Sequence, residues 1–129
     1  MKRFLYATLM ILFVTICAGC GENDYKHLTH DEAQKMIEEN PDVILLDVRT
    51  REEFEKRHIV NALNIPLNDL REGNFSALPD KDALIMIYCW TGRRAQDAAE
   101  ILIENDYTNV YEIGGIVDWE GSVSGNRLK

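Results

Sequence analysis

Short apolar runs alternate along this chain with segments whose apolar residues recur at helical spacing. Runs of this kind predict strands buried on both faces of a parallel sheet, and they span residues 43–48, 63–65, 83–88 and 109–113. The helical spacing predicts amphipathic helices over about 30–40 and 93–105. A capping box predicts a short polar helix over about 51–57, and a short last helix is expected after residues 114–115. Strands that alternate with helices in this way predict an α/β protein with a parallel sheet and helices on both faces.

Local signals define where the first helices begin and end. Thr29 with Glu32 and Thr50 with Glu53 each have the form of a capping box, in which Thr precedes the helix and Glu follows three places later. The first helix is expected to stop near residues 40–41, where Pro41 follows Asn40. Residues 68–79 are expected to form a loop, and one helical turn at the start of this loop is left as an alternative. The pair 114–115, both Gly, is expected to be a turn.

The N-terminus does not have the pattern of a folded domain. Lys2 and Arg3 precede an apolar stretch that is too short to span a bilayer comfortably, and small residues follow it. This order predicts a signal peptide over 1–19, with an uncleaved anchor helix as the alternative. The run Cys17-Ala18-Gly19-Cys20 resembles a bacterial lipobox, although its first place is more often aliphatic. We therefore expect a lipid on Cys20, a tether over 20–27, a single domain over 28–129, and an extracytoplasmic location at a periplasmic or cell-surface membrane.

The charge balance limits the classes of partner. Lys2 and Arg3 fall in the predicted signal peptide, so its removal takes the formal net charge from −8 to −10. Such a surface repels nucleic-acid phosphates, and a role in nucleic-acid binding is excluded on this ground. An anionic substrate would have to be attracted by local positive charge.

The cysteine count leaves one thiol in the predicted domain. With Cys17 removed and Cys20 acylated, only Cys89 remains, which predicts no internal disulfide and no Cys-rich metal site. Outside the cytoplasm, a lone thiol is either buried and inert or used for its reactivity.

The residues after Cys89 favour a reactive thiol. Cys89 ends the strand predicted over 83–88, and ligands of parallel α/β sheets collect beyond the carboxyl ends of the strands. The following helix offers unpaired backbone N–H groups, and Gly92 allows the loop to curl around an anion. Arg93 and Arg94 add positive charge, so the loop favours the nucleophilic thiolate and the binding of an anionic substrate.

The chain resembles a single rhodanese domain over about residues 28–121. The matching motifs keep the order and spacing of that family. They are Asp47-Val48-Arg49, Glu53-Phe54, His58-Ile59, Asn61-Ala62, Asn64-Ile65-Pro66, Tyr88-Cys89 with Gly92 and Arg94, and Gly114-Gly115 with Trp119. The resemblance implies a five-stranded parallel sheet flanked by helices. It also implies transfer of sulfane sulfur through a persulfide, without cofactor or metal. Asn61 stands where the family often has Gly, and it tolerates the same backbone conformation.

The resemblance also implies residue roles. Cys89 would be the nucleophile, and the loop around the persulfide or a bound oxyanion would consist of Trp90, Thr91, Gly92, Arg93 and Arg94. Asp47 and Arg49 would support the site or form a plain salt bridge. His58 is interpreted as structural rather than catalytic, and Trp119 as core packing.

The substrates and the class of activity leave alternatives open. The donor would be a small sulfur-containing anion such as thiosulfate or polysulfide, and the acceptor a thiol, cyanide or a protein. Trp90 leaves the donor open because thiosulfate-specialised members tend to be charged there. A cysteine phosphatase needs five residues between Cys and Arg, whereas four separate Cys89 from Arg94. A non-catalytic or redox-sensing binding module at the membrane is the remaining alternative.

Overall fold

A computed structural model describes residues 25–125 of the protein, and its main feature is a five-stranded sheet. The predicted signal peptide and Cys20 lie outside the described residues. The strands follow the order β1-β6-β5-β2-β4 and all pair in parallel. They are β1 (Lys26–His27), β2 (Ile44–Asp47), β4 (Leu63–Asn64), β5 (Ile85–Cys89) and β6 (Val110–Gly115). The five-stranded parallel sheet implied by the sequence is thereby confirmed.

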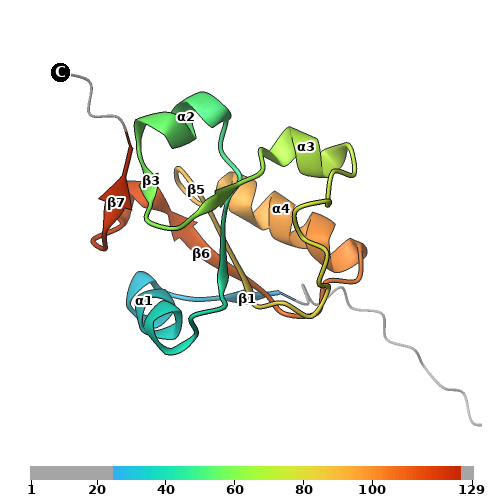
Figure 1. Ribbon diagram of the computed structural model, residues 1–129, viewed down its shortest axis with the longest axis horizontal. Helices are drawn as coiled ribbons and strands as arrows, with labels where there is room; N and C mark the ends of the chain where they lie inside the picture. Colours follow the sequence, from blue (N-terminus) through green and yellow to red (C-terminus); the bar gives the residue numbers. More distant parts are fainter. Residues whose placement is uncertain (1–24, 126–129) are drawn as a thin grey trace, which may run out of the picture.

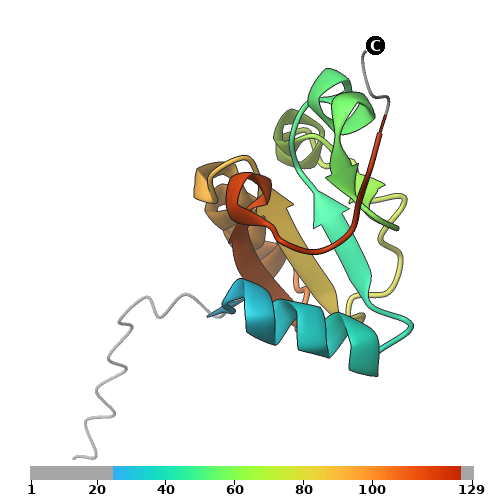
Figure 2. The ribbon, with the colours of Figure 1, turned by 90° about the vertical axis from the view of Figure 1, so that its left-hand side faces the viewer.

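Helices cover both faces of this sheet, as Figures 1 and 2 show. They are α1 (His30–Glu39), α2 (Arg51–Lys56), α3 (Leu67–Arg71), α4 (Arg93–Glu104) and the 3₁₀ helix η1 (Ile116–Asp118). α1 and η1 pack on one face of the sheet, and α3 and α4 pack on the other. A small antiparallel pair, β3 (His58–Ile59) with β7 (Val123–Ser124), lies beside α2. Among residues 25–125, no helix combines the length and the apolarity needed to cross a bilayer.

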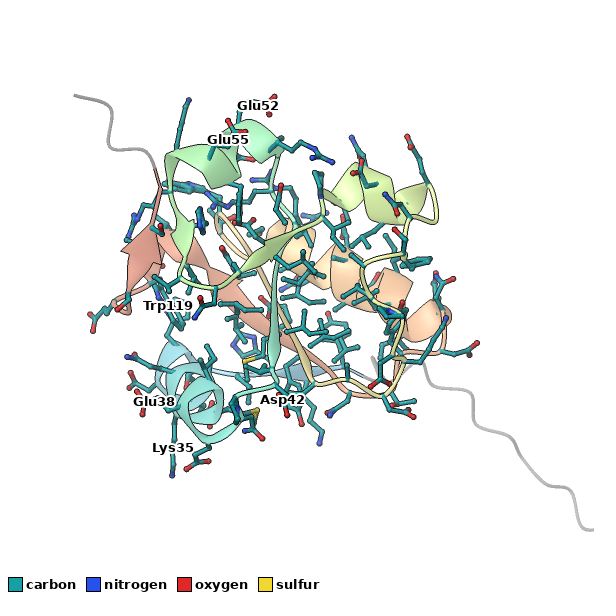
Figure 3. The ribbon with its side chains drawn as sticks, viewed as in Figure 1. Lys35, Glu38, Asp42, Glu52, Glu55 and Trp119 are labelled. Atoms are coloured by element: carbon teal, nitrogen blue, oxygen red, sulfur yellow. The ribbon has the colours of Figure 1, made fainter. Side chains whose placement is uncertain are left out.

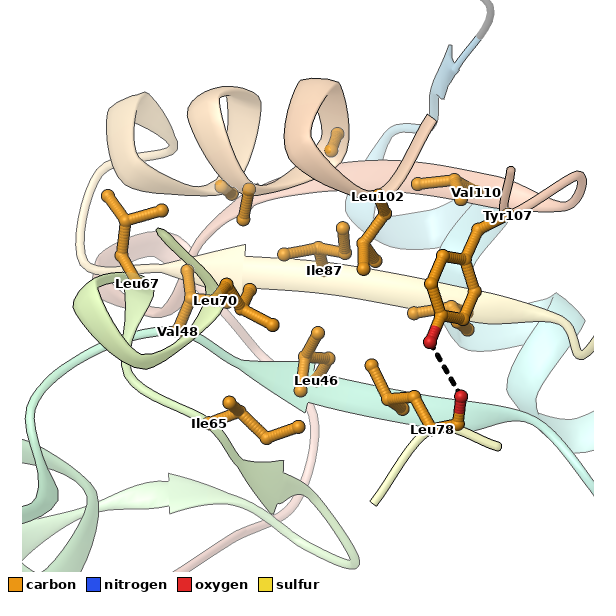
Figure 4. Packing of buried hydrophobic residues seen from close by; sticks show 14 of the residues in the cluster. Leu46, Val48, Ile65, Leu67, Leu70, Leu78, Ile87, Leu102, Tyr107 and Val110 are labelled. Atoms are coloured by element: carbon orange, nitrogen blue, oxygen red, sulfur yellow. Dashed lines mark hydrogen bonds between the residues drawn. The ribbon is translucent and has the colours of Figure 1, made fainter. Parts of the chain in front are cut away.

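The central strand β5 divides the core into two clusters. Every residue of β5 is buried, and successive side chains point to opposite faces of the sheet. Ile85 and Ile87 belong to the cluster on the side of α3 and α4, and Figure 4 shows Ile87 among residues such as Leu46 and Leu102. In the same cluster the Tyr107 hydroxyl donates to the carbonyl of Leu78 at 2.6 Å. The continuous burial explains why the 83–88 run lacks the alternation of a half-exposed strand.

Both predicted capping boxes are present. The amide of Glu32 donates to Thr29 Oγ1 at 3.3 Å, and Glu32 Oε2 accepts from the Thr29 amide at 2.9 Å. Thr50 and Glu53 repeat the same pair of bonds at 3.3 and 2.9 Å. These bonds satisfy amides that the first turn of a helix leaves without partners, so the two sequence signals set the starts of α1 and α2.

The helical turn considered at the start of the 68–79 segment is present as α3, which buries Leu67 and Leu70. Two other local predictions differ from the structure. Residues 26–27, assigned to the tether, form β1, because their backbone pairs with β6 although their side chains are exposed. Gly114 and Gly115 continue β6 instead of forming a turn. The shift of register between Ile87 and Cys89 is a β-bulge, and Gly114 absorbs it with a φ of 87°.

Candidate active site

Cys89 lies at the carboxyl end of the central strand, where the loop to α4 begins. Its register partner on β6 is Gly115, and the residue is 1% exposed. β5 sits between β2 and β6, so the chain order of the strands reverses beside it. Ligands of open parallel sheets bind at this kind of position, beyond the carboxyl ends of the strands.

The loop directs a backbone amide at the cysteine sulfur. Gly92 has a φ of 105°, which lies in the left-handed region that favours glycine. In this conformation its N–H donates to Cys89 Sγ at 3.0 Å. Gly92 also begins α4, and no side chain caps that helix. The first turn of α4 therefore keeps amides free of a side-chain acceptor, next to a sulfur atom that an N–H already contacts.

Gly115 holds the other side of the loop by close packing. A Cβ atom on Gly115 would overlap the carbonyl oxygen of Trp90 and lie 2.6 Å from Thr91 Cα. The same carbonyl accepts from the amide of Val117 at 3.2 Å. The loop therefore rests directly on the backbone at the end of β6, and glycine is the residue that permits this approach.

Arg94 is held in a two-point ion pair with Glu53 of α2. The guanidinium donates to the two carboxylate oxygens at 2.8 and 2.9 Å. The hydrogen bond from Arg94 is the largest cause that lowers the pKa of Glu53 to about 2. The same bond raises the pKa of Arg94, and the neighbouring Cys89 acts in the same direction. Arg94 thus stays charged beside the sulfur, in an orientation fixed by Glu53.

Asp47 and Arg49 form a buried ion pair at the end of β2. Their exposures are 0% and 2%, and Arg49 Nη2 lies 2.7 Å from Asp47 Oδ2. Burial opposes the charge on Arg49, but the bond and charge of Asp47 outweigh it and raise the pKa of Arg49. Arg49 Nη2 also donates to the carbonyl of Arg57 at 2.5 Å, which connects β2 to the end of α2. A supporting role of Asp47 and Arg49 at the active site stays a prediction.

A cavity of about 440 Å³ opens beside the loop. Its walls combine an aromatic residue, cationic residues and one carboxylate, namely Arg49, Glu53, Lys56, Arg57 and Trp90. Trp90 directly follows Cys89 and is 44% exposed. A smaller cavity of about 210 Å³ is lined by Arg94 of α4 and by Asn68 and Arg71 of α3, among others.

The other sequence candidates lie around this centre. Thr91 and Arg93 have exposed side chains in the loop and at the first position of α4. His58 stacks on Phe54 at 3.8 Å between ring centroids, and its Nδ1 lies 2.7 Å from the Phe54 carbonyl oxygen. These contacts agree with a structural role for His58. Trp119 is 7% exposed in the cluster on the α1 face, which agrees with core packing.

Four residues near the site escaped the sequence interpretation. Glu53 was identified in a capping box and in a family motif but was given no role at the site, and Lys56 and Arg57 were assigned only to a polar helix. Glu112 is 2% exposed, and its carboxylate lies 2.6 Å from His27 Nδ1 and 2.5 Å from the Gly114 amide. A charged residue inside the apolar run 109–113 was the signal for Glu112. Within residues 25–125, no group of three His, Cys, Asp or Glu is placed to hold a metal ion.

Comparison with known proteins agrees with this architecture. The family described as the rhodanese-like domain matches residues 29–122, so the chain belongs to the rhodanese-like family. The thiosulfate sulfurtransferase GlpE of Coxiella burnetii is 34% identical over 97 residues, covering 74% of this chain and 88% of that protein. The thiosulfate sulfurtransferase PspE of Escherichia coli is 41% identical over 73 residues, covering 57% of this chain and 70% of that protein.

Solved structures show the same fold. A structure described as a rhodanese with anions from E. coli superposes with a TM-score of 0.60 at 36% identity. It covers 65% of this chain and 99% of that one. A rhodanese-related protein from Thermoplasma volcanium gives a TM-score of 0.67 at 28% identity, covering 78% of this chain and 98% of that one.

Proposed function

We propose that the protein is a sulfurtransferase that carries sulfane sulfur as a persulfide on Cys89. The donor is a small anion such as thiosulfate or a polysulfide, and the acceptor is thiophilic, such as cyanide or a thiol. The proposal rests chiefly on the amide of Gly92, which donates to Cys89 Sγ at 3.0 Å at the uncapped start of α4. The relatives named thiosulfate sulfurtransferase give independent support.

The chemistry divides into two displacements at sulfur. In the first, the Cys89 thiolate attacks the outer sulfur of thiosulfate, the S–S bond of thiosulfate breaks, and sulfite leaves with the electron pair of that bond. In the second, cyanide attacks the outer sulfur of the persulfide, and Cys89 leaves again as a thiolate while thiocyanate is released. Each step conserves charge, and no external oxidant or reductant takes part.

The residues of the loop stabilise the anions of both steps. The Gly92 N–H and the start of α4 lie where negative charge resides on the thiolate and on the persulfide. Arg94 adds a fixed positive charge, oriented by its two bonds to Glu53. An inert structural cysteine has no need of this arrangement.

The length of the loop weighs against a cysteine phosphatase. For a phosphatase, the loop is one residue too short between Cys89 and Arg94. Sulfur transfer is therefore the function that the geometry supports best.

Mass spectrometry of the protein after treatment with thiosulfate or polysulfide tests the proposal. Wild-type protein is expected to gain one sulfur atom and to lose it on addition of cyanide, with thiocyanate released. Cys89→Ser is expected to do neither. Wild-type protein that accepts no sulfur from either donor, while hydrolysing a phosphate ester, would establish the phosphatase alternative instead.

We propose in addition that the protein is a lipoprotein held at an extracytoplasmic membrane surface through Cys20. The support is the order of charged, apolar and small residues before Cys20. Expressed in a bacterium, the full chain is expected to incorporate labelled palmitate. Cys20→Ala is expected to abolish the label, and Cys17→Leu, which restores the more usual lipobox residue, is expected to keep it. A label that persists in Cys20→Ala contradicts the anchor.

A further inference from the structure

The cavity beside the loop carries uncompensated positive charge. Two of its charged residues have partners, because Arg49 pairs with Asp47 and Glu53 pairs with Arg94. Lys56 and Arg57 are exposed and form no ion pair within residues 25–125. The cavity thus holds two unpaired cations, in a chain whose formal net charge is −8. An excess of positive charge at one place on an acidic protein attracts anions to that place.

The other acidic residues of α2 do not line the cavity. Glu53 and Lys56 are three residues apart in α2, and Arg57 follows as the extended residue at its C-terminal end. Glu52 and Glu55, which Figure 3 shows on the outer edge of α2, are absent from the cavity wall. Arg49 donates from Nη2 to the carbonyl of Arg57 and thereby holds the end of α2 in place.

The size and the aromatic wall of the cavity select an organic anion. A volume of about 440 Å³ is in the usual range for small-molecule sites and exceeds the needs of an inorganic sulfur anion. The half-exposed indole of Trp90 offers apolar contact, which stabilises carbon groups and does little for thiosulfate or sulfite. Trp90 directly follows Cys89 in the chain, and Glu53 of the same wall holds Arg94, so the cavity adjoins the Cys89 loop.

We propose that this cavity binds the sulfur acceptor and that the acceptor is an organic thiol bearing a carboxylate. The inference rests on the proposed function and specifies its second step. Lys56 and Arg57 bind the carboxylate, Trp90 contacts the carbon chain, and the thiolate of the acceptor attacks the outer sulfur of the Cys89 persulfide. The bond between that sulfur and Cys89 Sγ breaks, Cys89 leaves as a thiolate, and the acceptor departs as a persulfide. Atoms and charge balance without a further reactant.

A single-turnover experiment on preloaded protein tests this inference. The full chain is first loaded with sulfur and freed of donor, and loss of the persulfide is then followed with 3-mercaptopropionate or with the neutral thiol 2-mercaptoethanol. Lys56→Glu and Arg57→Glu are each expected to lower the second-order rate constant for 3-mercaptopropionate about tenfold, since each reverses a charge near the carboxylate. The rate constant for 2-mercaptoethanol is expected to stay within a factor of two.

Lys35→Glu is the matched control, because it changes net charge by the same amount on α1, which Figure 3 shows far from α2. It is expected to leave both rates unchanged. Trp90→Ala is expected to slow transfer to 3-mercaptopropionate, because it removes the apolar contact with the carbon chain. Protein that never loads with sulfur refutes the proposed function itself. If the protein loads normally but neither Lys56→Glu nor Lys35→Glu changes the ratio of the rate constants for the two thiols, only the acceptor site is refuted.

Discussion

Replacement of Gly115 by Ala tests whether the end of β6 positions the Cys89 loop. Gly115 has an extended backbone, with a φ of −119° and a ψ of 146°, which any residue adopts. In such a conformation Gly→Ala alone is expected to stabilise the protein by about 0.4–1 kcal/mol, through the lower entropy of the unfolded chain. A loss of stability would therefore come from the contact with the loop and from nothing else.

The contact is severe because it involves backbone atoms. The new Cβ would overlap the carbonyl oxygen of Trp90 and lie 2.6 Å from Thr91 Cα, and neither atom belongs to a flexible side chain. Overpacking of this kind costs about 1–3 kcal/mol, so we expect a net loss of about 1–2 kcal/mol. The loop must move to relieve the overlap. Misplacement by about 1 Å can reduce a reaction rate about 100-fold, so we expect sulfur transfer to fall about 10- to 100-fold.

Urea unfolding and the rate of thiocyanate formation measure the two effects. Gly73→Ala is the matched control, because a Cβ there has no heavy atom within 4 Å while φ is 84°. That variant is expected to lose about 1–2 kcal/mol through backbone strain and to keep the transfer rate of the folded protein. A Gly115→Ala protein with wild-type stability and activity would show that the loop does not depend on this contact.

Two charged pairs give further predictions. Because Arg94 depresses the pKa of Glu53 from 4.5 to about 2, the pair stabilises the fold above about pH 4.5 and loses this effect as the pH falls toward 2. Glu53→Gln is expected to lower the free energy of unfolding by about 1 kcal/mol at pH 7, after screening by solvent. Denaturation at pH 3 should show a smaller difference from wild type. An equal difference at pH 7 and pH 3 contradicts the lowered pKa of Glu53. Asp47→Asn leaves the buried charge of Arg49 without its counterion and is expected to cost about 3–5 kcal/mol in thermal or urea unfolding, whereas a cost below 1 kcal/mol would place water around Arg49.

The elements and fold class could be predicted because their causes are local. The two Thr-x-x-Glu sequences supply the side chains that accept hydrogen bonds from the free amides at a helix start. Both helices begin where these sequences predict. The run Ile85–Cys89 is apolar at each position because the strand is covered on both faces, so its composition indicated a buried strand of a parallel sheet. The same local logic predicted a catalytic loop after Cys89, and that role stays a prediction.

The errors arose where backbone pairing outweighed local preference. Lys26 and His27 carry no strand pattern, since their side chains stay exposed and only their pairing with β6 makes them a strand. Gly114 and Gly115 have the composition of a turn, yet the register of β5 against β6 keeps them in the sheet, with one residue bulged. Neighbouring strands supply these hydrogen bonds, so the segment's own residues cannot reveal them.

The sequence by itself determined four of the five strands of the parallel sheet, the helices α1, α2 and α4, the family resemblance and the placement of one cysteine before a cationic loop. The tertiary structure alone decided which charges surround that loop. Glu53 and Arg94 are 41 residues apart and form one ion pair, and Lys56 and Arg57 face Trp90 across a shared cavity. The contacts of α2 with β3 and its ion pair with Arg94 of α4 bring these groups together. Contacts between elements distant in the chain leave no periodicity in either segment, so no local pattern could have predicted them.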